Sequence, residues 1–139
     1  MRQAQSKLTI PTRGRGFYEI TGEIDRVVTD SGLITGLATL HLCHTSASLL
    51  IQENADPEVR LDLERFFSRL CPDGDPLFRH DCEGPDDMPA HIRTALTAVN
   101  LSIPLDQGAL VLGTWQGIYL WEHRRQPHQR QLVVHLVGE

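Results

Sequence analysis

Polar side chains that can do chemistry gather in the stretch CHTSASLLIQEN, residues 43–54. If this stretch is a β-strand, its two-residue period places His44, Ser46 and Ser48 on one face. Imidazole nitrogens ligate metals or transfer protons, and hydroxyls hydrogen-bond to phosphate or to a heterocyclic ring. The stretch is therefore either a solvated strand face or one wall of a binding site.

Two further stretches carry more polar side chains than a fold alone requires. The first is HDCEGPDDMPAHI, residues 80–92, with two histidines and four acidic residues. Asp87 and His91 lie four residues apart at the start of an expected helix, so both side chains can point toward one place. The second is GTWQGIYLWEHRR, residues 113–125. Its polar side chains include Gln116, Glu122, His123 and Arg124.

These histidines predict a divalent metal site of the zinc type. Three imidazoles from separate elements, with a fourth position left open, are a common catalytic arrangement for zinc. His44 in a strand, His91 in a helix and His123 at a strand end form the natural trio, and Asp87 or Glu122 would orient the rings or add a ligand. Magnesium and manganese stay open as alternatives, although imidazole favours zinc-like ions. Spacing alone also leaves open that these histidines are ordinary solvated groups.

Other familiar chemistries lack their motifs. The sequence has no G-x-S-x-G elbow, and Cys43 and His44 would face opposite sides of a strand. It also has no glycine-rich phosphate-binding motif. Phosphate would therefore be bound by Arg15 or Arg124, by the hydroxyls of residues 45–48, or by a metal. A net charge of −5 with scattered basic residues argues against a nucleic-acid partner.

Length and composition predict one domain, residues 1–139, with 40% hydrophobic and 22% charged residues. Three cysteines without C-x-x-C spacing leave one unpaired in any disulfide scheme, which is typical of a reducing compartment. No apolar run approaches membrane length, and the first residues lack the apolar core of a signal peptide. We therefore expect a cytoplasmic protein with no membrane partner.

The hydrophobic pattern predicts two or three helices. Thr21 would cap a short helix that ends before Gly32. Asp56 and Pro57 would begin a second helix, and we expect its apolar stripe to belong to the core. That stripe consists of Val59, Leu63, Phe66, Phe67 and Leu70. Asp87 would cap a third helix with a buried stripe of Ile92, Ala95, Leu96 and Val99.

The remaining residues have the pattern of strands joined by connections of hairpin length. The expected strands are two short segments within 6–20, then 33–43, 43–54, 101–104, 109–114, 118–123 and 132–137. This order of elements predicts an α+β domain built on antiparallel β-sheet.

Four ordered blocks give the sequence a likeness to a known family. HTSASL, ENADPEVRLDLERFF, HDCEGPDDMPAHI and GTWQGIYLWEHR resemble the signature blocks of the YjbQ family, also called the secondary thiamine-phosphate synthase family. RGF at 15–17 and GE at 138–139 fit the same pattern, so the resemblance spans nearly the whole chain. It implies a YjbQ-like α+β fold, assembly as a homotrimer, and a histidine-lined pocket near the subunit interface, often with a metal ion.

The family name implies a transferase that joins hydroxymethylpyrimidine diphosphate to a thiazole phosphate and releases pyrophosphate. The expected partner is therefore a small phosphorylated metabolite. Residue chemistry and the matching positions together give the expected catalytic residues Ser46, Ser48, Asp87, Gln116, Glu122 and Arg124. The expected substrate-binding residues are Thr45, Asn54, Arg15 and His80, and the expected metal ligands are His44, His91 and His123.

Two other functions are compatible with these residues. A metal-dependent hydrolase of an unidentified small metabolite would use metal-bound water, with Asp87 or Glu122 as base. A non-catalytic trimer that binds a metal or a small ligand would retain the ligand without turnover. The lack of a D-D-x-x-D-type magnesium cluster counts against a strong diphosphate enzyme.

Overall fold

The computed structural model describes the whole chain, residues 1–139, as eight strands and three helices. The strands are β1 Arg2–Pro11, β2 Gly16–Glu19, β3 Gly36–Leu42, β4 Ala47–Glu53, β5 Asn100–Asp106, β6 Ala109–Leu110, β7 Gln116–Glu122 and β8 Gln129–Gly138. The helices are α1 Thr21–Ser31, α2 Pro57–Leu70 and α3 Asp87–Leu96. The predicted α+β class with antiparallel sheets is confirmed.

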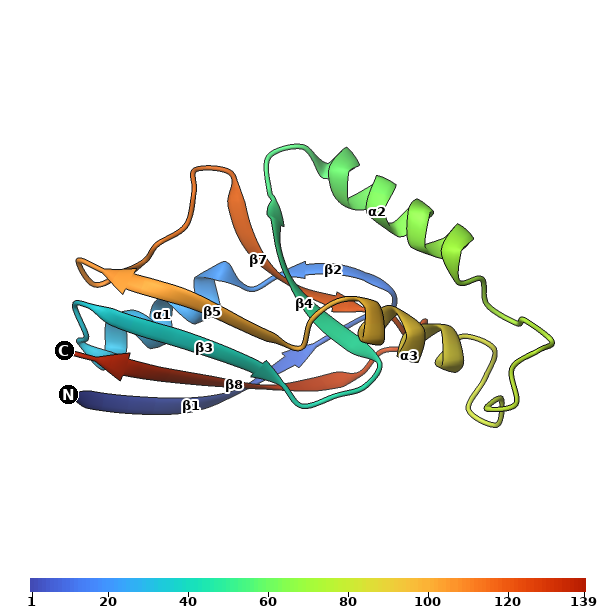
Figure 1. Cartoon of the computed structure of the whole chain (residues 1–139), viewed down its shortest axis with the longest axis horizontal. Coiled ribbons are helices and arrows are strands. Elements are labelled where there is room, and N and C mark those ends of the chain that lie inside the picture. Colours follow the sequence, from blue (N-terminus) through green and yellow to red (C-terminus); the bar gives the residue numbers. More distant parts are fainter.

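Two antiparallel sheets carry the fold, in the strand orders β1-β8-β3-β5-β6 and β2-β7-β4 (Figure 1). β1 and β8 pair along their whole lengths, so the two chain ends lie side by side (Figure 1). β3 approaches β8 closely where Gly36 lies opposite Gly138. A Cβ on Gly36 would lie 2.1 Å from the Val137 carbonyl oxygen, so a larger residue cannot fit without moving a strand.

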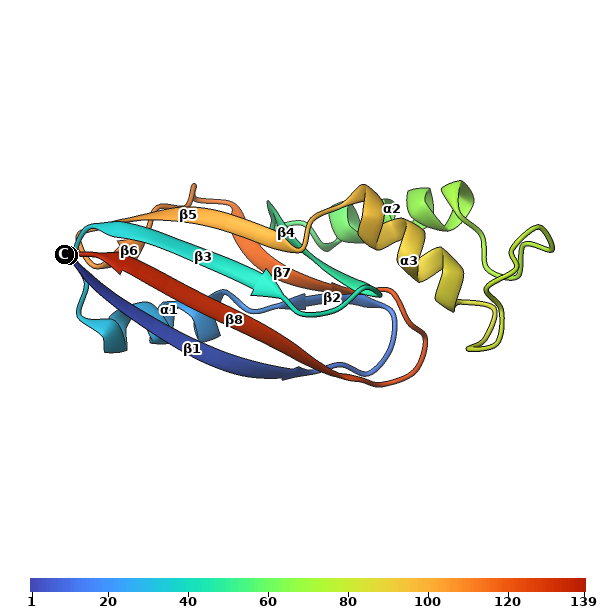
Figure 2. The same ribbon diagram turned by 60° about the horizontal axis from the view of Figure 1, so that its bottom comes forward.

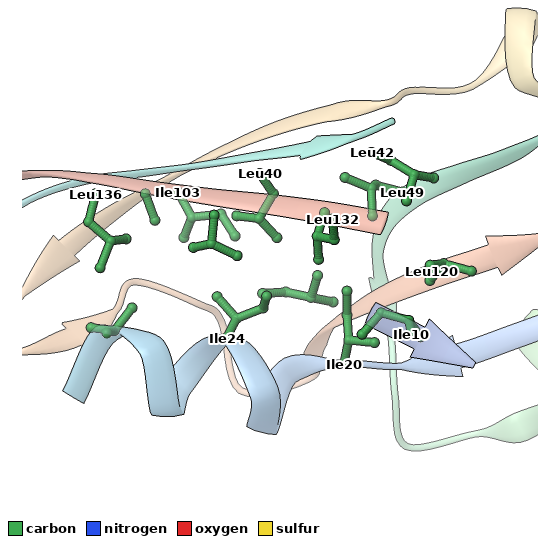
Figure 3. Close-up of a cluster of buried hydrophobic side chains, with 14 of the residues drawn as sticks. Ile10, Ile20, Ile24, Leu40, Leu42, Leu49, Ile103, Leu120, Leu132 and Leu136 are labelled. Carbon is green, nitrogen blue, oxygen red and sulfur yellow. The ribbon is translucent and has the colours of Figure 1, made fainter. Parts of the chain in front are cut away.

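The hydrophobic core lies between α1 and the strands that face it. Figure 3 shows Ile20 and Ile24 directed toward Leu40 and Leu132 across this core. α1 buries Ile24 and Val28 and ends, as predicted, at Gly32, which has a left-handed φ of 71°. None of the three helices has the length and apolar composition needed to cross a lipid bilayer.

The first turn of α1 differs from the prediction. Thr21 is the first helical residue, and Ile20 holds the cap position without a side-chain hydrogen bond. The Thr21 hydroxyl instead donates to the Glu19 carboxylate and accepts from the backbone N–H of Ile118. A threonine beside two sheet strands has these competing partners, which local sequence does not reveal.

α2 begins as predicted, since the Asp56 carboxylate accepts from the Glu58 backbone N–H at 2.9 Å. The prediction that its stripe belongs to the core is wrong: no α2 residue is buried, and Phe66 and Leu70 are 51% and 54% exposed. Figures 1 and 2 show α2 lying to one side of the strands, beyond the ends of most of them.

α3 also departs from the prediction. The residue before it is Asp86, and no side-chain hydrogen bond caps it. Leu96 of the expected buried stripe is 57% exposed, whereas Arg93 is fully buried. The Arg93 guanidinium pairs with Glu64 of α2 and donates to the Ser68 hydroxyl at 3.1 Å. Polar contacts therefore join the two helices where an apolar stripe was expected.

The chain crosses between the sheets at residues 43–46. The expected strand 43–54 begins only at Ala47 and pairs with β7. His44 and Ser46 therefore precede the strand, and only Ser48 of the three alternating polar residues lies within it. The expected strand 109–114 is likewise shortened to the two residues of β6.

Candidate functional site

Four potential metal ligands lie together where the loop after α2 meets α3. His80, Glu83, Asp87 and His91, here called the His80–His91 cluster, offer ligand atoms within 4.8 Å of one another. Asp87 Oδ2 lies 2.8 Å from His80 Nε2 and 3.1 Å from His91 Nε2, and His80 Nε2 lies 3.6 Å from Glu83 Oε2. Ligands around a tetrahedral zinc ion, with bonds of about 2.0–2.1 Å, lie about 3.3 Å apart. The donor types and their spacing fit such an ion.

His91 faces an oxygen atom with each of its ring nitrogens. Nδ1 lies 2.8 Å from the Thr45 carbonyl oxygen, and Nε2 lies 3.1 Å from Asp87 Oδ2. A neutral imidazole has only one N–H, so it cannot donate to both oxygens. The ring is therefore either an imidazolium or a neutral ring whose Nδ1–H donates to Thr45. The neutral form leaves the Nε2 lone pair free for a metal, which is how ligating histidines are usually oriented.

Asp87 is the centre of the cluster, and its side chain is only 2% exposed. Its second oxygen, Oδ1, accepts a hydrogen bond from Arg124 Nη1 at 2.9 Å. Burial would raise the pKa of Asp87, but the hydrogen bond with His80 and the charge of Arg124 lower it below its ordinary value. Asp87 is therefore an anion, as a metal-ligating carboxylate must be.

A cavity of about 300 Å³ opens beside His80. Phe78 and Met88 give it apolar walls, and Asp75 and Asp81 line it as well. This volume lies at the lower end of the range of about 300–1,000 Å³ found for small-molecule pockets. The cluster therefore borders a space in which a small ligand can bind.

His44 does not belong to the His80–His91 cluster of its own chain. Its Nε2 accepts a hydrogen bond from the Gln131 backbone N–H at 2.7 Å, and the Arg130 guanidinium lies 3.4 Å from Nδ1. Burial and the charge of Arg130 lower the pKa of His44. The imidazole is thus a neutral hydrogen-bond acceptor at the crossing between the sheets.

His123 is fully buried and also lies outside the cluster. Its Nε2 lies 2.8 Å from the Ser48 hydroxyl oxygen, and its Nδ1 has no hydrogen-bond partner. Burial, with the charges of Arg93 and Arg15, lowers the pKa of His123 to about 2. The expected trio of His44, His91 and His123 is therefore not assembled within one chain, because each ring is held in a different environment.

Glu122 and Ser46 are both bound to a buried arginine that no sequence motif had singled out. Arg130 Nε donates to Glu122 at 2.8 Å, and Arg130 Nη2 donates to the Ser46 hydroxyl at 3.0 Å. The Thr12 hydroxyl also donates to Glu122, at 2.7 Å. Burial would raise the pKa of Glu122, but the hydrogen bonds from Arg130 and Thr12 lower it. This network joins β7 to β8 and leaves the Glu122 side chain fully buried within the chain.

The β4–β7 register separates two further expected site residues from the cluster. Glu53 lies opposite Gln116 and Ala47 lies opposite Glu122. Gln116 is therefore six positions from Glu122 along β7, or about 20 Å. Asn54 directly follows Glu53 and lies at the same distant end.

Of the expected substrate-binding residues, His80 lies in the cluster and Thr45 contacts it through its carbonyl oxygen. Arg15 instead forms two hydrogen bonds of 3.0 Å with Asp73. Glu83 was missed as a potential ligand. No spacing rule points to it, because it lies in the loop before α3, where three- or four-residue intervals do not bring side chains together.

Known proteins resemble this chain over nearly its whole length. Residues 6–139 match the family model described as UPF0047 protein YjbQ-like. The chain is 54% identical to the UPF0047 protein sll1880 of Synechocystis, with 99% of this chain and 94% of that protein covered. It is 47% identical to the UPF0047 protein YjbQ of Salmonella typhimurium, with 97% of this chain and 98% of that protein covered.

Two solved structures share the fold. The crystal structure of a conserved hypothetical protein from Thermus thermophilus has a TM-score of 0.86 and 36% identity, covering 95% of this chain and 99% of that one. An uncharacterized YjbQ/UPF0047 protein from Clostridium acetobutylicum has a TM-score of 0.86 and 34% identity, with the same coverage. The resemblance of the four sequence blocks is confirmed: the chain belongs to the UPF0047 YjbQ-like family.

Proposed function

We propose that the chain binds a divalent metal ion of the zinc type at the His80–His91 cluster and acts on a small phosphorylated metabolite beside it. The observation that carries this proposal is the environment of His91, whose two ring nitrogens both face oxygen atoms. Two imidazoles and two carboxylates are a ligand set that suits zinc-like ions better than magnesium. Manganese and magnesium are the alternatives to be compared in the assays.

Each side chain of the cluster, and each of its neighbours, has a separate role in this proposal. The bond from His91 Nδ1–H to Thr45 directs Nε2 toward the ion. Arg124 holds Asp87 by Oδ1 and leaves Oδ2 for the ion. His80 and Glu83, which are 48% and 60% exposed, form the open side from which substrate approaches. A bound ion would supply positive charge to the phosphate oxygens of the substrate.

Formation of thiamine phosphate is the first reaction to test, because the family resemblance names it. The carbon–oxygen bond between the pyrimidine methylene and the diphosphate breaks, and pyrophosphate leaves with the electron pair. The thiazole ring nitrogen then forms the new carbon–nitrogen bond. Support from this chain comes from the cavity beside His80, where Phe78 and Met88 offer apolar walls to a planar ring. Arg124 adds positive charge behind the cluster.

The test mixes metal-stripped protein with synthetic hydroxymethylpyrimidine diphosphate and thiazole phosphate and measures the release of pyrophosphate. The measurement is repeated after zinc, manganese or magnesium is added back. We expect metal-dependent turnover that falls by about 10²-fold or more in His91→Gln, as for loss of a metal ligand or its orientation. His135→Gln removes a histidine of β8 that contacts Gln5 and should keep the wild-type rate. Turnover that survives metal removal would overturn the proposal. Metal binding without turnover of any phosphorylated compound would favour the non-catalytic binding protein.

We further infer that copies of this chain associate, in the homotrimer that the resemblance implies, through the apolar stripe of α2. Phe66 and Leu70 are about half exposed and lie beside each other on this helix. In sedimentation velocity, Phe66→Glu should give monomers, and Arg65→Glu, off the stripe, should not. A wild-type monomer at micromolar concentration would contradict this inference.

A further inference from the structure

A second cavity of about 300 Å³ lies at the end of α2, next to α3. Its polar wall is formed by Arg15, Arg93 and Arg125, with Ser68 and Asp73. None of its lining residues belongs to the His80–His91 cluster. The three guanidinium groups come from distant parts of the sequence, so the fold itself brings them together.

Positive charge predominates on this wall. Asp73 is its only carboxylate, and it accepts two hydrogen bonds of 3.0 Å from Arg15. Arg125 Nη2 also lies 2.5 Å from the Asp73 carboxylate. Arg93 pairs with Glu64, which lies outside the wall. Even when Glu64 is included, the guanidinium groups outnumber the carboxylates.

One buried N–H donor of the wall has no acceptor within the chain. A guanidinium has five N–H groups. Arg93 donates to Glu64 and to the Ser68 hydroxyl, while its Nε is buried and has no partner. The side chain of Arg93 is 0% exposed, and Nε is its one nitrogen without a hydrogen-bond partner. A buried donor in this state destabilises the fold unless an acceptor reaches it.

We propose that this cavity binds a phosphate group, either as inorganic phosphate or as part of a small phosphomonoester. Guanidinium forks match pairs of phosphate oxygens, and several of them converge here. Asp73 already presents two carboxylate oxygens to Arg15 and a contact to Arg125, in the way that phosphate oxygens would. This ligand site goes beyond the metal-dependent function and does not require the metal.

The structure supplies a spectroscopic reporter for the test. Trp121 Nε1 donates to Glu64 at 2.8 Å, and Glu64 is the partner of Arg93. The other tryptophan, Trp115, is 63% exposed and can be replaced by phenylalanine. Inorganic phosphate and glycerol 3-phosphate are titrated into Trp115→Phe protein while Trp121 emission is followed. Calorimetry on the wild type gives an independent dissociation constant.

Three substitutions distinguish phosphate binding at this site from nonspecific electrostatic attraction of the anion to the protein. Arg125→Gln, at a side chain 58% exposed, should weaken binding about tenfold, as for loss of one charge-assisted hydrogen bond. Asp73→Asn should strengthen binding, because it removes the competing carboxylate. Arg65→Gln removes the same charge from the outer face of α2 and should leave the dissociation constant within about twofold.

His91→Gln protein, handled with a chelator, should bind the probes as the wild type does. This experiment distinguishes phosphate binding in the cavity from phosphate binding to a metal ion at the His80–His91 cluster. Saturable binding of either probe with the predicted order of variants supports the proposal. Absence of saturable binding at millimolar concentrations of both probes would overturn it. Equal weakening by Arg125→Gln and Arg65→Gln would overturn it as well.

Discussion

Acid should destabilise this fold through His123 at pH values where most carboxylates are still ionised. The imidazole is fully buried beside the Trp121 ring, and burial with the charges of Arg93 and Arg15 lowers its pKa to about 2. In the unfolded chain the pKa returns to about 6.5. Between these values the unfolded state binds one more proton than the native state, so stability falls as pH falls. From about pH 6.5 to 5 the loss is about 2 kcal/mol.

Urea unfolding of the wild type and His123→Gln at about pH 7.5 and about pH 5 measures this contribution. The glutamine amide keeps a polar partner for the Ser48 hydroxyl but cannot take up the proton. The acid-induced loss of stability should be smaller in the variant by about 2 kcal/mol. Each protein is compared with itself, so any constant cost of the substitution cancels. An equal loss in both proteins would mean that native His123 is protonated, and the neutral buried imidazole would be refuted.

Two stability predictions concern buried contacts of the sheets. Glu122→Gln should lower the free energy of unfolding by about 3–5 kcal/mol, because it leaves the Arg130 guanidinium buried without a counter-charge. A loss below about 1 kcal/mol in urea unfolding would argue against this ion pair. Gly36→Ala should cost at least about 1–3 kcal/mol, since the new Cβ would meet the Val137 carbonyl. Gly22→Ala in α1, where a Cβ meets nothing within 4 Å, is the matched control, and equal melting temperatures for the two variants would contradict the clash.

The parts of the fold that could be predicted from the sequence have local causes. Asp56 and Pro57 fix the start of α2 through a cap and a preset backbone angle, and Gly32 ends α1 because it adopts a positive φ. Burial of a helix face depends instead on what lies opposite. Phe66 and Leu70 have the spacing of a core stripe, yet α2 lies to one side of the strands and leaves them exposed.

In the candidate site, too, only the contacts between residues close in the sequence could be predicted. Asp87 and His91 could be placed together because they lie four positions apart in one helix, whereas His80 and Glu83 reach them from the loop before α3. His44 and His123 lie far from His91 in the sequence, and no local rule decides which distant histidines meet. Their rings have other partners in the fold, the Gln131 backbone N–H and the Ser48 hydroxyl.

The central claim concerns which side chains hold the ion, and elemental analysis after equilibration with zinc and exhaustive dialysis tests it most directly. The account predicts about one zinc per wild-type chain. It predicts loss of that zinc in folded His80→Ala and His91→Ala protein, and retention in His44→Ala and His123→Gln. A wild-type protein without zinc would contradict the account. So would a His44→Ala protein that loses zinc as completely as His91→Ala does, because the ion would then lie outside the His80–His91 cluster.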